Sequence, residues 1–263
     1  MARMPSKPKG TGEISTVKAA EAPKMFTSGS GIITIPGLRT NTVKVLIVGT
    51  APLITHKFSE KAESMILAKH MGEASRGREK KDPEANFMAA RHRLKDGGDG
   101  FPAGGFKAAI ASATGKEVGF AKTVAKGALR VIPDCPATNL IRILTPHEPV
   151  MRQDVVRNES GVVDIRHRPQ FWPWGMLISV DFVPDLCSAQ QVLQAVAMAG
   201  FRAGIGEWRP SSPKSLSGAW GTWRLAEPVE VEAFEDGRLF ETEAFQADNV
   251  ASETGSEYRQ AAE

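Results

Sequence analysis

Residues 203–223 read AGIGEWRPSSPKSLSGAWGTW and combine four glycines, three tryptophans and two cations in one segment. Glycine lets a backbone come close to a ligand, tryptophan offers a flat face for a base, and Arg209 and Lys214 can pair with phosphates. The segment therefore predicts a glycine-rich loop that contacts a nucleic-acid backbone. The alternative is a β-hairpin whose tryptophans fill the core and whose glycines only make turns.

Regular elements are predicted on both sides of this loop. Residues 187–200 read as a helix with Ser188 as its N-cap and Gly200 as its end, and residues 221–225 read as a strand. Upstream, the sequence predicts strands over residues 42–49, 128–132, 140–144 and 174–183, and helices over residues 58–70, capped by Ser59, and after Pro102. This order, β-α-(α)-β-β-β-α-β, predicts an α+β fold without internal repeats.

Charge divides the chain into a basic body and an acidic tail. Residues 227–263 hold eleven acids and two arginines, a net charge of −9, so residues 1–226 carry +12. This arrangement recurs in nucleic-acid-binding proteins, although an acidic tail can also serve only to keep a basic protein soluble. Residues 1–24 are predicted to be a disordered basic segment, residues 228–240 a final strand or docked segment, and residues 246–263 disordered.

Several classes of protein are disfavoured. The chain has no apolar run long enough to span a membrane, and residues 1–24 lack the apolar stretch of a secretory signal. Cys135 and Cys187 have no spacing typical of a zinc site or a disulfide framework. P-loop, HExxH and GxSxG motifs are absent. We therefore expect a protein without metal, cofactor or membrane partner, in the cytoplasm of a bacterium or of a phage-infected host.

Three segments occur in an order that resembles a known family. They are the strand TVKVLIVG at 42–49, the segment FPAGGFKAAI at 101–110 and the loop GIGEWR at 204–209. Together they resemble the RAMP superfamily, the repeat-associated proteins that form the backbone of CRISPR effector complexes. Phage genomes also carry stand-alone proteins of this general kind. The matching positions are Pro102, Gly105, Phe106, Lys107 and Ala108 in the second segment, and Gly204, Gly206, Gly218 and Gly221 in the loop.

The resemblance implies both a fold and a function. It implies a ferredoxin-like (RRM-type) antiparallel sheet over residues 25–226, with helices on one face and an extended basic arm at residues 145–170. It also implies a non-enzymatic subunit that binds single-stranded RNA or DNA and oligomerises along it into a filament. The arginines of residues 145–170 could instead pair with the acids of a solvated loop. The expected nucleic-acid-binding residues are Lys107, Arg142, Arg152, Arg157, Arg166, Arg168, Arg202, Gly204, Gly206, Trp208, Arg209 and Lys214.

Two alternatives to this function stay open. His56 follows the first predicted strand, where some RAMP endoribonucleases carry a catalytic histidine, so a metal-independent endoribonuclease is the first alternative. General acid–base catalysis needs a second group within reach, and the sequence does not identify one. His92 and His167 each lie between arginines, which favours phosphate contact or solvent exposure over proton transfer. A phage structural or assembly protein is the second alternative. Trp172 and Trp174 are predicted to face a core or a neighbouring subunit.

Overall fold

The computed structural model describes residues 24–28, 31–35, 37–58, 60–72, 82–115, 117–157, 161, 163–212 and 218–242. The predictions for residues 1–23, Ser59, Lys214 and the tail beyond residue 242 lie outside these residues, and so does the side chain of Arg157. In the part described, none of the helices is long and apolar enough to cross a membrane.

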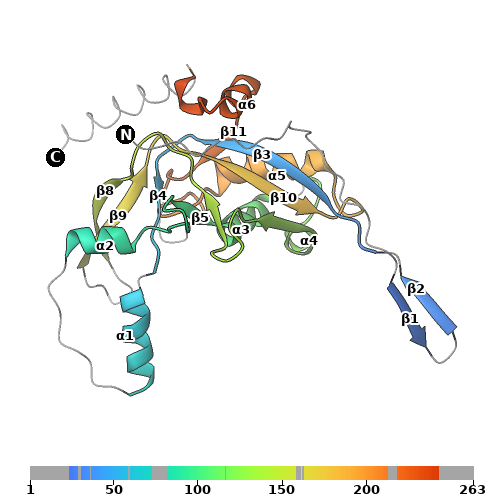
Figure 1. Ribbon diagram of the computed structural model, residues 1–263, viewed down its shortest axis with the longest axis horizontal. Helices are drawn as coiled ribbons and strands as arrows, with labels where there is room; N and C mark the ends of the chain where they lie inside the picture. Colours follow the sequence, from blue (N-terminus) through green and yellow to red (C-terminus); the bar gives the residue numbers. More distant parts are fainter. Residues whose placement is uncertain are drawn as a thin grey trace.

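A four-stranded antiparallel sheet forms the centre of the molecule (Figure 1). Its strands are β3 (Asn41–Gly49), β6 (Leu129–Ile132), β10 (Gly175–Phe182) and β11 (Trp223–Leu225), in the order β11-β3-β10-β6. Helix α3 (Ala103–Ala113) lies between β3 and β6 in the chain, and α5 (Ala189–Arg202) connects β10 to β11. The expected combination of helices with an antiparallel sheet is therefore confirmed.

The main core lies between one face of this sheet and the helices α3 and α5. Alternate residues of the strands point into it because successive side chains of a strand face opposite sides. Ile47 and Ile178 are fully buried there, together with Phe106 of α3. The Phe106 ring meets the Trp223 ring edge to face, with centroids 5.5 Å apart. Burying a side chain of this size stabilises the fold by about 1.5–3 kcal/mol.

The opposite face is partly covered by the last elements described, α6 (Pro228–Glu235) and the 3₁₀-helix η1 (Leu239–Glu241). Leu239 packs there against Leu46 and Val48 of β3. Of the two predictions for residues 228–240, the docked segment is confirmed and the strand is wrong. The segment is helical because Pro228 occupies the first helical turn and Glu230 forms a capping box with Glu227, the N-cap residue.

The structure does not show an extended basic arm at residues 145–170. They contain β8 (Val150–Arg157) and most of β9 (Val163–Phe171), which pair over eight residues as an antiparallel hairpin. The short strand β4 (Leu53–Ile54) adds to β9, giving a second sheet in the order β4-β9-β8. Helix α2 (Pro83–Ala89) lies beside this hairpin (Figure 1). β4 joins the hairpin at one end, where Leu53 and Ile54 pair with Phe171 and Gln170 of β9.

The remaining elements surround these two sheets. A hairpin of β1 (Lys24–Ser28) and β2 (Gly31–Ile35) projects at one end of the molecule, and α1 (Glu60–His70) extends from the other (Figure 1). Strand β5 (Gly100–Pro102) pairs with β7 (Leu140–Arg142), and α4 (Lys122–Ala128) leads into β6. The helices α2 and α4, each seven residues long, were not predicted from the sequence.

Helix α5 begins as predicted and ends later. Ser188 accepts a hydrogen bond from the Gln191 backbone and Gln191 bonds back to it, which completes a capping box. The helix does not stop at Gly200 but continues to Arg202. A Cβ atom at Gly200 would collide with the carbonyl oxygen of Trp223, so this glycine allows α5 to pack closely on β11. Its role is in packing, not in helix termination.

Candidate nucleic-acid interface

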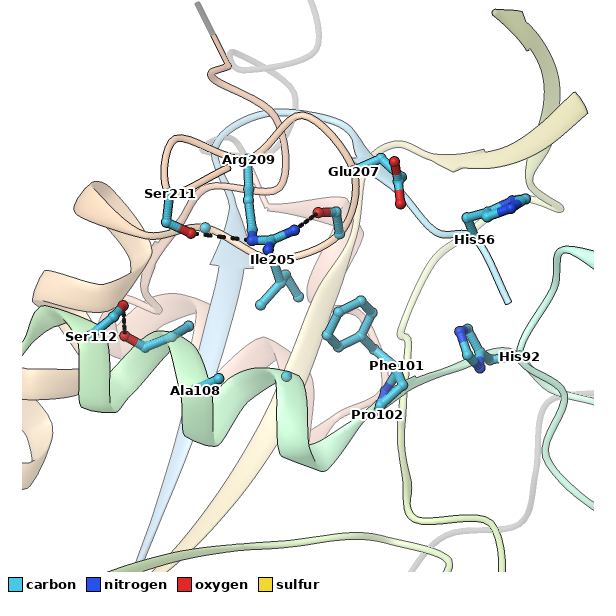
Figure 2. A pocket seen from close by; sticks show the side chains of 14 residues that line it. His56, His92, Phe101, Pro102, Ala108, Ser112, Ile205, Glu207, Arg209 and Ser211 are labelled. Atoms are coloured by element: carbon cyan, nitrogen blue, oxygen red, sulfur yellow. Dashed lines mark hydrogen bonds between the residues drawn. The ribbon is translucent and has the colours of Figure 1, made fainter. Parts of the chain in front are cut away.

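An open cleft of about 530 Å³ lies between α3 and the glycine-rich loop (Figure 2). One wall is the α3 surface with Gly105, Ala108 and Ser112, and the other is the loop from Gly204 to Ser211. Two of the three segments that carry the family resemblance, residues 101–110 and 204–209, therefore face each other across one cleft. Three of the predicted binding residues line it, namely Gly204, Gly206 and Arg209.

The glycines of the loop are required by its own packing. Gly206 has a φ of +77°, and a Cβ atom there would collide with the carbonyl oxygen of Ile54 in β4. At Gly204, with a φ of +62°, a Cβ atom would lie 2.8 Å from Pro210 Cδ. Positive φ favours glycine strongly. These positions thus match the alternative explanation, in which glycines make turns, and the turns place the rest of the loop on the cleft.

Arg209 is held at the cleft by its own loop. Its Nη1 donates to the Gly206 carbonyl at 2.8 Å and its Nε donates to Ser211 Oγ at 3.2 Å (Figure 2). Both bonds close a short turn and fix the guanidinium between the two walls. An arginine fixed in this way can pair with a phosphate without first losing side-chain freedom.

A cluster of arginines and tryptophans connects the loop to the β8–β9 hairpin. The Arg152 guanidinium lies 5.2 Å from the Trp208 ring centroid and 4.7 Å from that of Trp220. The two rings meet edge to face at 6.3 Å, and the Arg168 guanidinium lies 5.7 Å from Trp208. Trp208 is half-buried rather than exposed. The structure therefore brings three predicted residues together, Arg152, Arg168 and Trp208, but as a mutually stacked cluster.

Three of the hairpin arginines, those whose side chains the structure describes, lie beside acids, as the alternative for residues 145–170 proposed. Arg152 Nε donates to Asp154 at 2.7 Å, and Arg166 lies 3.8 Å from Asp164. The side chain of Arg168 is 1% exposed and lies 3.6 Å from both Asp154 and Glu207. Burial lowers the pKa of Arg168, an effect that Glu207 opposes. In the structure Arg168 therefore faces two carboxylates, and the expectation that it contacts a phosphate stays a prediction.

Other predicted residues lie away from the cleft lining. Lys107 is half-buried on α3, and Arg202 is exposed at the end of α5. Arg142 forms an ion pair with Asp96, and its backbone N–H donates to Asp134 at 2.8 Å. These contacts give Arg142 a structural role in the β7 region. Trp174 is fully buried and Trp172 packs against the main core, which confirms the prediction that they face a core.

The cleft also contains a second histidine beside His56. His56 follows β4 and His92 follows α2, and the Lys57 N–H donates to the Ala90 carbonyl at 2.9 Å, which holds the two segments side by side. Both side chains line the same end of the cleft, with Glu207 near His56 (Figure 2). The sequence offered no signal for this pair because the two histidines meet only through a tertiary contact.

The environment lowers the pKa of both histidines. Burial, then the positive charge of Lys57, lowers the pKa of His92 to about 4. Burial, then the charge of Arg168, lowers the pKa of His56, and Glu207 opposes this effect. Both are therefore neutral at pH 7 and able to accept a proton. His167 is buried, and its Nε2 lies 3.2 Å from Gln153 Oε1, so of the two expectations for His167, phosphate contact or solvent exposure, solvent exposure is wrong.

The segment that carries His92 is fixed by a buried ion pair. Arg91 Nε and Nη2 donate to the two carboxylate oxygens of Asp99 at 2.9 and 2.5 Å, and Nη2 also reaches Glu148 at 2.8 Å. Such bidentate pairs hold a backbone in one geometry.

Among the described residues, no three His, Cys, Asp or Glu side chains lie close enough to hold a metal ion. No protein-family model matches the chain, and no curated protein matches it in sequence.

Proposed function

We propose that this chain is a single-stranded nucleic-acid-binding protein of ferredoxin-like, RAMP-type fold. The fold proposal is supported by the strand order β11-β3-β10-β6, with every pairing antiparallel and with α3 and α5 as the two connecting helices. The function is carried by one observation: the glycine-rich loop and the α3 segment form opposite walls of one cleft.

The chemistry of the cleft suits a sugar–phosphate backbone. The α3 wall is built from small residues, Gly105, Ala108 and Ser112, which leave room for a chain to lie against the helix. Arg209 provides a fixed cation on the opposite wall. Trp208 and Trp220 belong to the same loop and are both half-buried, so bases can stack on the exposed parts of their rings. Oligomerisation along the strand forms part of the same proposal.

The test is equilibrium binding of labelled single-stranded RNA and DNA at a series of salt concentrations. Each phosphate contact should contribute about −0.7 to the slope of log K against log salt. Arg209→Gln should weaken binding and reduce that slope by about one contact, or 0.7. Arg39→Gln is the matched control, because Arg39 is 66% exposed and pairs with Asp185 outside the cleft. An affinity that does not change with salt, or equal effects of both substitutions, contradicts the proposal.

The two histidines favour a second candidate, metal-independent cleavage of RNA. In this reaction the ribose 2′-oxygen attacks the adjacent phosphorus while one histidine accepts the 2′-hydroxyl proton. The other histidine, protonated, donates its proton to the departing 5′-oxygen, which leaves a 2′,3′-cyclic phosphate. His56 and His92 lie at the same end of the cleft, as this chemistry needs. Because both pKa values are lowered, the protonated donor is scarce at pH 7.

Cleavage would therefore be fastest below pH 6.5. The rate should rise with pH through the lower histidine pKa, which for His92 is about 4, and fall through the higher one. The assay is RNA cleavage in EDTA, with a DNA of the same sequence as the control that lacks the 2′-hydroxyl. His56→Ala and His92→Ala should each slow the reaction about 10²- to 10⁴-fold. Intact RNA across pH 4 to 7, alongside demonstrated binding, leaves the protein a non-enzymatic binder.

A further inference from the structure

Arg168 is a buried cation with unmade hydrogen bonds. Its Nη1 lies 3.6 Å from Asp154 Oδ2 and its Nη2 lies 3.6 Å from Glu207 Oε2, both longer than a normal hydrogen bond. Its Nε and Nη1 and the Oδ2 atom of Asp154 have no hydrogen-bond partner among the described residues. A guanidinium that is 1% exposed and incompletely bonded is costly for the fold. An added oxygen acceptor would relieve this cost.

The two carboxylates beside Arg168 differ in how firmly they are held. Asp154 is 2% exposed and already accepts a 2.7 Å bond from Arg152 Nε. Glu207 is 35% exposed and stands at the edge of the cleft (Figure 2). The Glu207 backbone N–H donates to the Ile54 carbonyl at 2.9 Å, so the side chain can turn away while the loop stays in place.

The loop around Glu207 has an unusual backbone. Trp208, the next residue, has a φ of +53°, a conformation that costs a residue with a side chain about 1–3 kcal/mol. This conformation puts the Trp208 ring against the Arg168 guanidinium, at 5.7 Å. Strain of this kind persists where the surrounding structure holds a residue in place, and it concentrates at ligand sites.

We propose that Arg168 is an anion site that the Glu207 carboxylate occupies in the free protein, and that a phosphate of the bound strand displaces Glu207. The identity of the ligand rests on the proposed function. Arginine pairs with a phosphate through two parallel N–H donors, so a phosphate in the place of Glu207 would bond Nη2, which Glu207 faces, together with one of the donors that lack a partner among the described residues. Displacement of Glu207 would also couple phosphate binding to Trp208, because both side chains contact the same guanidinium.

The first experiment compares the affinity of Glu207→Gln and wild-type protein for a labelled single-stranded oligonucleotide at low salt. Removing the competing carboxylate should tighten binding about fivefold, the size of one partly exposed ion pair. Glu232→Gln, an exposed residue of α6, removes the same charge away from the cleft and should leave the affinity unchanged. Wild-type affinity or weaker binding in Glu207→Gln overturns the proposal while leaving nucleic-acid binding itself intact.

The second experiment needs no nucleic acid. A ligand that binds only the folded state raises the melting temperature. We expect inorganic phosphate, compared with chloride at equal ionic strength, to raise the melting temperature of Glu207→Gln more than that of the wild type or of Glu232→Gln. Equal shifts in all three proteins overturn the anion site. If no protein binds an oligonucleotide but phosphate stabilises Glu207→Gln selectively, the anion site stands and the proposed function fails.

Discussion

Two partly or fully buried arginine–carboxylate pairs in this molecule have opposite character. Arg224 of β11 holds Glu230 of α6 through two bonds of 2.7 and 2.8 Å, and Glu230 also accepts a 2.7 Å bond from the Glu227 N–H. Arg168 of β9 reaches its two carboxylates only at 3.6 Å, and its Nε and Nη1 have no hydrogen-bond partner in the part of the chain that the structure describes. The first pair is complete and fastens α6 to the sheet. The hydrogen bonding of the second pair is incomplete, as expected of a site that can bind a further ligand.

The largest expected effect is on the complete pair. Glu230 is fully buried, so Glu230→Ala would remove all three bonds and leave Arg224 without its main partner. We expect a loss of about 3 kcal/mol in the free energy of unfolding, measured by urea denaturation. The exposed neighbour on α6, Glu232→Ala, should change stability by less than about 0.5 kcal/mol. Similar small effects for both would show that the Arg224–Glu230 pair does not hold α6.

The same pair should make stability depend on pH. Burial raises the pKa of Glu230, but the hydrogen bonds from Arg224 and the Glu227 backbone outweigh it, so the pKa in the folded protein is lowered. A carboxylate with a lowered folded pKa contributes stability that is present above its unfolded pKa, near 4.5. That stability is lost as pH falls through the folded value. The free energy of unfolding of the wild type should therefore exceed that of Glu230→Gln by more at pH 7 than at pH 3, as measured by urea denaturation at both pH values.

Sequence patterns were sufficient for the apolar parts of the fold. The run TVKVLIVG at 42–49 became β3, and Ser188 with Gln191 formed the cap of α5. Local patterns of this kind carry their own physical cause. The strand predicted within residues 228–240 was wrong. The valines at 229 and 231 alternate as in a strand, but Pro228 and the buried Glu230 favour a helix.

The candidate site was only partly predictable, since it depends on contacts between distant segments. The glycine-rich loop, Trp208 and Arg209 were found from composition, but His92 joins His56 only through the contact between β4 and the end of α2. Residues 145–170 were predicted to be an extended basic arm because the stretch is long and basic, with a solvated loop of paired arginines and acids as the alternative. In the hairpin, paired positions share a face, and Arg152 stands opposite Arg168 on the side that meets the tryptophans. No local signal gives that register.

Substituting Trp208 tests whether the ring that lies against Arg168 contributes to ligand binding or to stability. Stacking on a base is worth about 1–3 kcal/mol, so Trp208→Ala should weaken oligonucleotide binding about 5- to 150-fold. Because Trp208 is only half-buried, the cooperative melt should survive, unlike in Trp223→Ala, which empties a core position. Fluorescence anisotropy gives the affinity and circular dichroism the melt. A Trp208→Ala protein that no longer melts cooperatively would place this ring among the structural residues.

We expect the smallest change in stability for Arg168→Lys. Comparing it with Arg224→Lys distinguishes the two arginine–carboxylate pairs directly. Lysine keeps the charge near Asp154 and Glu207 but loses the planar fork of donors. Since the bonds of Arg168 are already long, we expect the free energy of unfolding to change by less than about 1 kcal/mol. Arg224→Lys is the matched control and should cost more, about 1.5–3 kcal/mol, because it gives up two short bonds to a buried carboxylate. Oligonucleotide affinity should show the reverse order, with Arg168→Lys the weaker binder. If Arg168→Lys is instead as destabilised as Arg224→Lys, the Arg168 guanidinium is a closed structural contact and the contrast between the two pairs is lost.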